Sequence, residues 1–338
     1  MNRQNRTLWV SLLLLATCGT ISRAEEPAVK DLPATLTQIQ SAIKSSGAKW
    51  VAGETSLSRL SRKDWQHRVG LGFAPIKAPR LLMMAAPQAT PASVDWRANN
   101  GNFVTGVRDQ GQCGSCWAFS LTGALESYVL LTQNKPGTEL SLSEQVLISC
   151  GGAGSCNGGQ LDASYLKSTG LPPADYYPYT ATNGSCSTAK PGWKTHTYKI
   201  GTWGSVDKNL DAIKSALATY GPLPIAFYVY EDFMHYKSGV YAYTTGKELG
   251  GHGVLLVGYN DAEKYFIVKN SWGPNWGENG FFRIAYSQMS TSVNFGLSTI
   301  AYHSGQSTQM MSMQKAAAHH ISADETLQLI EPFLQQRP

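Results

Sequence analysis

Three polar residues that lie far apart in the chain have the types needed for nucleophilic attack on a carbonyl carbon. Cys116 lies in the string QGQCGSCWAFS (residues 110–120), His252 in GGHGV and Asn270 in KNSWGPNWGENG. A thiol with a pKa near ~8.5 is mostly protonated at neutral pH, and the thiolate is the attacking species. A helix N-terminus and an adjacent imidazole both favour the thiolate, and an amide can orient the imidazole. The three residues therefore predict a cysteine nucleophile, its base and an orienting group.

Taken singly, each residue has an ordinary structural interpretation. A cysteine in an apolar helix is usually a small core residue, and a lone histidine or asparagine is usually a satisfied polar group. The occurrence of all three in separate motifs favours the catalytic interpretation.

Cysteine parity also points to Cys116. The chain has six cysteines, and Cys18 lies in an N-terminal segment with the layout of a secretory signal, which leaves five. In an oxidising compartment four of these can pair, and one must stay free. The alternatives are a redox pair of Cys113 and Cys116, or a zinc site of four cysteines. A redox pair of this kind follows a strand of a βαβ unit, and residues 105–112 do not supply such a strand. A zinc site would use cysteines that are expected to form disulfides in a secreted protein. We therefore expect no metal and no cofactor.

Helical patterns surround the candidate nucleophile. We expect a helix with Ser115 as its N-cap and Cys116 in its first turn. Residues 141–144 (SLSE) predict a capping box that opens a second helix, and residues 207–220 predict a third, ended by Gly221 and Pro222. The buried stripe of the first helix is expected to consist of Leu121, Ala124, Leu125, Tyr128 and Val129.

Beyond Pro222 the pattern changes to short runs of β-branched and aromatic residues between Gly, Asn and Asp turns. The expected strands cover residues 223–230, 253–259, 265–269, 281–286 and 297–302. The fold class is therefore expected to be α+β, with a mainly helical half over about residues 107–210 and a β half over about residues 211–303.

Residues 1–24 contain Arg3 and Arg6, then an apolar run, then Ser22-Arg23-Ala24 at the end, which is the layout of a secretory signal. The apolar run is shorter than the ~20 residues that span a membrane, so we expect a soluble product without stable membrane insertion. The sequence around Cys18 weakly resembles a lipoprotein cleavage box, but Thr17 fits it poorly. Loss of Cys18 with the signal is the preferred interpretation.

Residues 25–90 are expected to form a separate unit. Leu36, Ile39 and Ile43 recur at helical spacing, and a Pro- and Ala-rich linker open to proteolysis ends the segment. Residues 25–91 carry nine Lys and Arg against five Asp and Glu, whereas residues 92–303 carry fourteen against fifteen. Because the basic bias lies outside the presumed working domain, we expect no nucleic-acid partner.

The three strings together resemble the papain and cathepsin family of cysteine peptidases over residues 91–303, and the WVAG string in residues 25–90 resembles the short propeptide of the cathepsin B branch. The resemblance implies a papain-like two-domain fold, with a mainly helical domain, a β-barrel-like domain and the cleft between them. It implies Cys116 as the nucleophile, His252 as its proton acceptor and Asn270 as the orienting residue.

The same resemblance assigns supporting residues. Gln110 matches a side-chain amide that joins the Cys116 backbone N–H in an oxyanion hole, where one donor is worth on the order of 10²–10³ in rate. Trp272 matches an indole that shelters the Asn–His hydrogen bond from water. The implied disulfides pair Cys113 with Cys156 and Cys150 with Cys186.

For substrates, the resemblance implies that Gly158 and Gly159 bind an extended peptide through their backbone. The positions that match the S2 pocket are Leu161, Ala226, Gly251 and, five residues after the position of Phe295, Ile300. None is charged, so a hydrophobic residue is expected at P2. The histidine-bearing loop that gives the cathepsin B branch its exopeptidase activity has no counterpart in residues 160–177, which favours an endopeptidase.

The expected partners are protein or peptide substrates and the chain's own propeptide, which would act as an intramolecular inhibitor of a monomeric enzyme. The alternative is a catalytically silent binding module, although all four matched catalytic residues are present. Residues 304–338 are expected to form a C-terminal extension with a short amphipathic helix. The expected location is extracellular, periplasmic, or lysosomal or vacuolar, depending on the host.

Overall fold

The computed structural model describes residues 34–72, 78–81 and 90–304. The expected signal segment and the helix expected in the C-terminal extension lie outside them. The α-helices are α1 Leu36–Ser46, α2 Arg62–Gln66, α3 Cys116–Thr132, α4 Glu144–Cys150, α5 Ser164–Ser168 and α6 Leu210–Tyr220. The strands are β1 Lys49–Ala52, β2 Ser93–Asp95, β3 Gly154–Ser155, β4 Gly158–Gly159, β5 Thr202–Ser205, β6 Leu223–Tyr230, β7 Tyr236–Tyr241, β8 Glu248–Asn260, β9 Tyr265–Lys269, β10 Phe281–Ala285 and β11 Ile300–His303.

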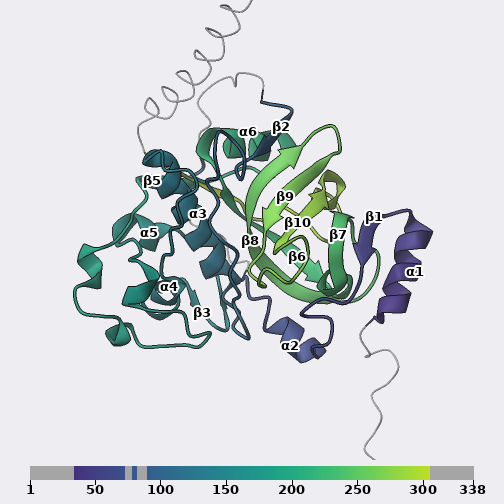
Figure 1. Ribbon diagram of the computed structural model, residues 1–338, viewed down its shortest axis with the longest axis horizontal. Helices are drawn as coiled ribbons and strands as arrows, with labels where there is room; N and C mark the ends of the chain where they lie inside the picture. The colour runs from purple at the N-terminus through teal and green to yellow at the C-terminus, as the bar shows by residue number, and fades with distance from the viewer. Residues whose placement is uncertain (1–33, 73–77, 82–89, 305–338) are drawn as a thin grey trace, which may run out of the picture. The chain divides into compact units, whose positions relative to one another are not determined.

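The main sheet has the order β1-β7-β10-β9-β8-β2, and β6 pairs with β8 on the same edge as β2, opposite β9. It curls into a half-barrel (Figure 1). Its pairings are antiparallel except for the parallel pair β10 and β7. The central strand β8 pairs with β6, β9 and β2, so it is anchored over most of its length. Two small sheets, β5 with β11 and β3 with β4, complete the described strands.

The expected strands agree with the structure at β6 and β9, which begin and end at the predicted residues. Strand β8 begins five residues earlier than expected, at Glu248, and therefore contains His252. The glycines before and after His252 have the pattern of a turn, but residues 250–253 all pair with β6 and so belong to the strand. Strand β11 begins at Ile300, later than expected.

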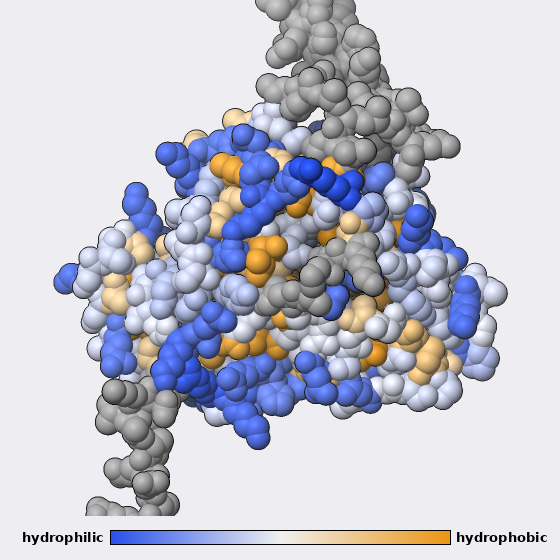
Figure 2. Space-filling view, turned by 180° about the vertical axis from the view of Figure 1, so that it is seen from behind, coloured by the Kyte–Doolittle hydropathy of each residue, from blue (hydrophilic) through white to orange (hydrophobic). Residues whose placement is uncertain are grey.

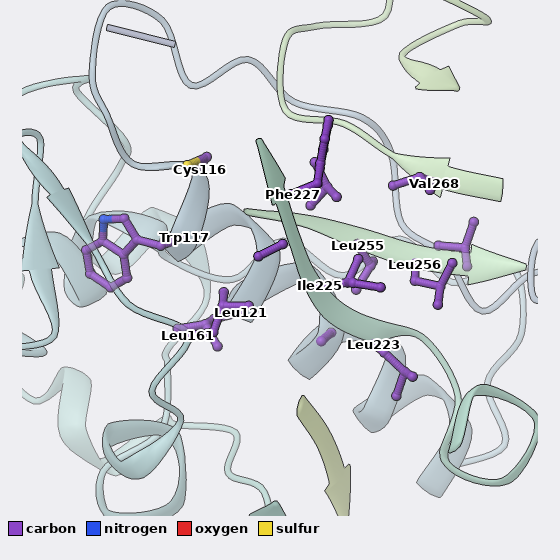
Figure 3. Close-up of a cluster of buried hydrophobic side chains, with 14 of the residues drawn as sticks. Cys116, Trp117, Leu121, Leu161, Leu223, Ile225, Phe227, Leu255, Leu256 and Val268 are labelled. Carbon is purple, nitrogen blue, oxygen red and sulfur yellow. The ribbon is translucent and has the colours of Figure 1, made fainter. Parts of the chain in front are cut away.

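Helix α3 is buried on every side, and the expectation of one buried stripe is wrong. All residues from Cys116 to Leu130 are buried. The helix packs against β8, β6 and β11 and also against α4 and β4. Figure 3 shows Leu121 of α3 in this core together with Ile225 of β6 and Leu255 of β8. The helix therefore lies inside the protein, and it carries Cys116 at its N-terminus.

Ser115 is the N-cap of α3 as predicted, but the hydrogen bonds expected at the starts of α3 and α4 differ in detail. The Ser115 hydroxyl makes no capping hydrogen bond to α3 and instead lies 2.7 Å from the Tyr179 hydroxyl. Helix α4 is capped by Ser143, whose Oγ accepts the Val146 N–H, so Glu144 is its first residue. In contrast, α6 ends before Gly221 as predicted.

The N-terminal segment packs onto the edge of the main sheet. Strand β1 pairs antiparallel with β7, and α1 forms at the predicted positions with Thr35 as its N-cap. Trp50 is buried against Tyr241, with ring centroids 5.2 Å apart. Arg62 forms an ion pair of 2.9 Å with the buried carboxylate of Glu231. The segment is therefore docked on the β half by apolar, backbone and charged contacts.

The face in Figure 2 is mostly polar, with apolar side chains in small separate patches. Within the described residues, Val51 is the large hydrophobic side chain that is clearly exposed. No described helix combines the length and apolarity needed to cross a bilayer. The same residues contain no group of three or more His, Cys, Asp or Glu side chains placed to hold a metal ion.

Candidate active site

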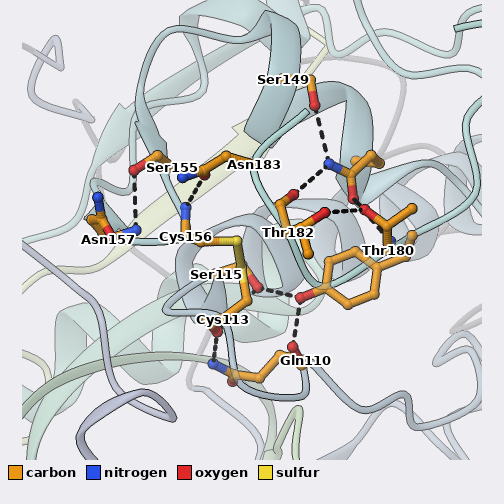
Figure 4. The surroundings of a disulfide bond; sticks show 12 residues. Gln110, Cys113, Ser115, Ser149, Ser155, Cys156, Asn157, Thr180, Thr182 and Asn183 are labelled. Carbon is orange, nitrogen blue, oxygen red and sulfur yellow. Dashed lines mark hydrogen bonds between the residues drawn. A yellow bond between two sulfur atoms is a disulfide. The ribbon is translucent and has the colours of Figure 1, made fainter. Parts of the chain in front are cut away.

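Cys116 is the first residue of α3, and it is the free cysteine in the part of the chain that the structure describes. The loop before it is tied down by the disulfide Cys113–Cys156 (Figure 4). The Gly114 N–H also donates to the Cys156 carbonyl at 2.8 Å. The second disulfide joins Cys150 to Cys186. Both bridges are those that the resemblance implies, and the redox pair of Cys113 and Cys116 does not form.

His252 of β8 and Asn270, directly after β9, lie side by side because β8 pairs with β9. His252 Nε2 lies 2.8 Å from Asn270 Oδ1, which also accepts the Ser271 N–H. Since Oδ1 accepts both bonds, Nε2 carries the proton and Nδ1 has the free lone pair. Trp272 stacks on the imidazole, with ring centroids 4.7 Å apart, and shields this hydrogen bond.

The thiol and the imidazole are both fully buried. Burial raises the pKa of Cys116 to about 11, and it lowers the pKa of His252 to about 4. Cys116 Sγ accepts the Gly253 N–H at 3.4 Å, while His252 Nδ1 has no hydrogen-bond partner among the described residues. Burial therefore favours the neutral thiol and the neutral imidazole in this structure.

Gln110 is completely buried, and its side chain is held at both ends. Its Nε2 donates to the Cys113 carbonyl at 2.8 Å, and its Oε1 accepts from Ser271 Oγ at 2.7 Å. The Tyr179 hydroxyl donates to the Gln110 carbonyl at 2.6 Å. The second Nε2 hydrogen remains for an oxyanion, so the geometry is compatible with the role implied by the resemblance.

A short stretch of the N-terminal segment, residues 69–72, covers this site. The N–H groups of Gly70 and Leu71 donate to the Gly251 carbonyl at 3.0 and 2.9 Å. Gly159 donates to the Gly70 carbonyl and accepts from the Gly72 N–H, at 2.8 and 2.7 Å. These bonds hold an extended strand between β4 and β8, where the resemblance places a peptide substrate. A hollow beside the strand is lined by residues 69–72 together with Gly158, Gly159 and Gly251.

The structure does not bring every residue of the expected S2 pocket to this hollow. Leu161, Ala226 and Ile300 are almost fully buried and do not line it. Figure 3 places Leu161 with Trp117 and Leu121 in the apolar core.

Sequence reasoning missed several residues that shape the site. The Trp117 indole packs under β4, and a Cβ at Gly159 would meet it at 2.5 Å, so only glycine fits there. Gly253 follows His252 and Ser271 follows Asn270 in the sequence. The position of each next to a candidate catalytic residue could have identified it. Tyr179 had no signal, because its place beside Gln110 depends on the path of a loop far along the chain.

The fold and this geometry together define a class of protein, a cysteine-type peptidase whose cleft is filled by its own N-terminal segment. The family description "Papain family cysteine protease" matches residues 90–303. Cathepsin B-like CP2 of Giardia intestinalis is 36% identical over 72% of this chain and 86% of that protein. Pro-cathepsin H of Medicago truncatula is 41% identical over 72% of this chain and 71% of that protein.

A solved structure of digestive procathepsin L 3 from the Tenebrio molitor larval midgut superposes with a TM-score of 0.66. It covers 79% of this chain and 87% of that chain at 26% identity. The chain therefore belongs to the papain family of cysteine proteases and has the papain-like fold. The procathepsin neighbour also indicates that the chain is a zymogen with its own propeptide.

Proposed function

We propose that this chain is the precursor of a secreted cysteine endopeptidase in which Cys116 attacks the peptide carbonyl and forms an acyl-enzyme. The observation that carries the proposal is the free thiol at the N-terminus of α3, whose Sγ accepts the N–H of Gly253, the residue after His252, while His252 Nδ1 has no hydrogen-bond partner among the described residues. Its Nε2 is fixed by Asn270 at 2.8 Å.

The proposed reaction begins when the cleft is hydrated after the propeptide leaves. His252 Nδ1 takes the proton of Cys116, and the α3 N-terminus favours the resulting thiolate. The thiolate sulfur then bonds to the carbonyl carbon, while the oxyanion is held by the Gln110 amide and the Cys116 N–H. His252 returns the proton to the leaving amine, and water hydrolyses the thioester.

The proposed substrate is an extended peptide that replaces residues 69–72. Gly159 and Gly251 would offer it the backbone groups that now bond Gly70, Leu71 and Gly72. Leu71 is buried and bridges to Gly159, which supports an apolar residue at P2. The S2 positions Leu161, Ala226 and Ile300 are apolar as well, although they lie in the core in this state.

Residues 25–90 are proposed to be the inhibitory propeptide, and cleavage near residues 85–91 would release the enzyme. The two disulfides and the signal-like segment support secretion or residence in another oxidising compartment. The missing histidine-bearing loop after Gly159 supports endopeptidase activity.

The decisive experiment compares processed wild type with Cys116→Ala on a fluorogenic peptide with Leu at P2. We expect hydrolysis and labelling by an epoxide inhibitor in the wild type, and the loss of both in the variant. If Cys116→Ala retains hydrolysis, or if the folded, processed wild type cleaves no peptide, the proposal is wrong and the silent binding module is favoured.

A further inference from the structure

Arg68 of the propeptide is held at the active site by a carboxylate that the catalytic scheme does not use. Its guanidinium forms an ion pair with Asp109, the residue before Gln110. The Arg68 side chain is only 10% exposed, whereas that of Asp109 is 50% exposed. The Arg68 carbonyl accepts the Trp272 indole N–H at 3.2 Å. One propeptide residue is therefore bound through both its backbone and its side chain.

The position of the Asp109 carboxylate is fixed by the fold. Its Oδ1 accepts the Gly111 N–H at 2.8 Å. On either side of Asp109, the Gln110 N–H donates to the Ser271 carbonyl and the Gly273 N–H donates to the Arg108 carbonyl, at 2.8 and 3.1 Å. These bonds pair the segment before Cys116 with the segment after Asn270. The carboxylate therefore stays beside Trp272 whether or not the propeptide is present.

Arg68 and Leu71 lie on opposite sides of the nucleophile. Gly70 packs against Gly114, where an added Cβ would meet the Gly114 carbonyl oxygen at 2.3 Å, and it also lies within reach of the Cys116 sulfur. Leu71 then bridges to Gly159, and Arg68 lies at Asp109 and Trp272. If Gly159 binds the acyl part of a substrate, Asp109 faces the part that leaves as the amine.

We propose that Asp109 and Trp272 form a subsite for a basic side chain on the leaving-group side of the scissile bond. The inference rests on the proposed peptidase function and adds a determinant of its specificity. When the propeptide leaves, a half-exposed carboxylate with a fixed position faces the cleft, and an arginine or lysine of the substrate replaces the Arg68 guanidinium there.

The test uses enzyme processed from the full chain, with active sites counted by an irreversible thiol inhibitor. Internally quenched peptides share one acyl part with Leu at P2 and carry Arg, Gln or Glu at each of the first two positions after the scissile bond. We expect kcat/KM for Arg to exceed that for Gln by about fivefold at one of these positions, as befits a partly exposed ion pair. The preference should shrink as salt is added.

Asp109→Asn is the informative variant, because its amide oxygen can still accept the Gly111 N–H while the charge is lost. We expect the Arg preference to fall to about one, because kcat/KM for the Arg peptide drops to that for the Gln peptide. Asp207→Asn is the matched control: Asp207 is 49% exposed and also pairs with a propeptide arginine, Arg80, outside the cleft. This variant should keep the full preference.

Equal rates for the Arg, Gln and Glu peptides in the wild type would overturn the subsite while leaving the peptidase proposal intact. The same holds if Asp109→Asn keeps the Arg preference. An enzyme with a titratable Cys116 that cleaves none of the peptides would instead overturn the peptidase proposal, and the subsite with it.

Discussion

Burial controls the charge of the two residues on which the chemistry depends. The thiol of Cys116 and the imidazole of His252 are fully buried beneath residues 69–72. With pKa values of about 11 and about 4, both groups are neutral across the range between these values. Residues 69–72 therefore cover both groups and keep them from solvent. We expect removal of this segment to return both groups to contact with solvent.

The reactivity of Cys116 toward iodoacetamide should report this state. Because the pKa of the thiol is raised to about 11, the thiolate fraction at pH 7 is on the order of 10⁻⁴ and rises about tenfold per pH unit below pH 11. We expect slow alkylation of the full chain at pH 7 that accelerates with pH, and much faster alkylation of the processed enzyme at pH 7. Mass spectrometry of the Cys116 peptide measures both rates. Equal rates in the two forms at pH 7 would contradict this account of the thiol.

Two strands, the long β8 and the two-residue β4, position the site at the scale of elements. Strand β8 carries His252 next to Gly251, and β4 carries Gly159 above the Trp117 indole. Residues 69–72 bond to both strands through their backbone. A side chain that pushes this stretch away should therefore open the cleft without altering the catalytic residues themselves.

Gly70→Ala and Gly72→Ala form a matched pair for this prediction. A Cβ at Gly70 would meet the Gly114 carbonyl oxygen at 2.3 Å, while a Cβ at Gly72 would lie 3.5 Å from the Gly159 oxygen, in ordinary contact. Overpacking of this kind costs ~1–3 kcal/mol. We expect the unprocessed Gly70→Ala chain to hydrolyse a small fluorogenic peptide about tenfold faster than the unprocessed wild type.

The unprocessed Gly72→Ala chain should match the wild type. Initial rates, with electrophoresis to show that the chains are still intact, provide the measurement. If Gly70→Ala is as silent as Gly72→Ala, residues 69–72 do not keep the cleft closed.

In the described residues, helix α3 forms the core shared by the two halves of the molecule. The two disulfides join residues of the helical half only. The Cys113–Cys156 bridge joins residues 43 positions apart in sequence, and the Cys150–Cys186 bridge joins residues 36 positions apart. The β half is held instead by its continuous sheet, and β5 and β11 connect the late part of the helical half to the end of the described chain. The disulfides thus stabilise the helical half, and the hydrogen bonds of the main sheet stabilise the β half.

Removing the Cys150–Cys186 bridge should destabilise the precursor. Opening a loop of this length costs roughly 3–4 kcal/mol in the chain-entropy account. The double variant Cys150→Ser and Cys186→Ser, made in a Cys116→Ala background to prevent thiol exchange, should therefore unfold at lower urea concentration than its Cys116→Ala parent. An unchanged urea midpoint would show that this bridge does not stabilise the fold.

Local patterns in the sequence already predicted the candidate catalytic trio, the odd cysteine and strands β6 and β9, because each depends on neighbouring residues or on parity. Other features depend on contacts between distant segments. Strand β8 extends through His252 only because β6 pairs with it, and α3 is buried all round only because elements pack on all its sides. Likewise, the neutrality of Cys116 and the meeting of Arg68 with Asp109 arise from the way the propeptide lies in the cleft. Tertiary structure decided these, since burial and long-range ion pairs depend on what the fold brings into contact.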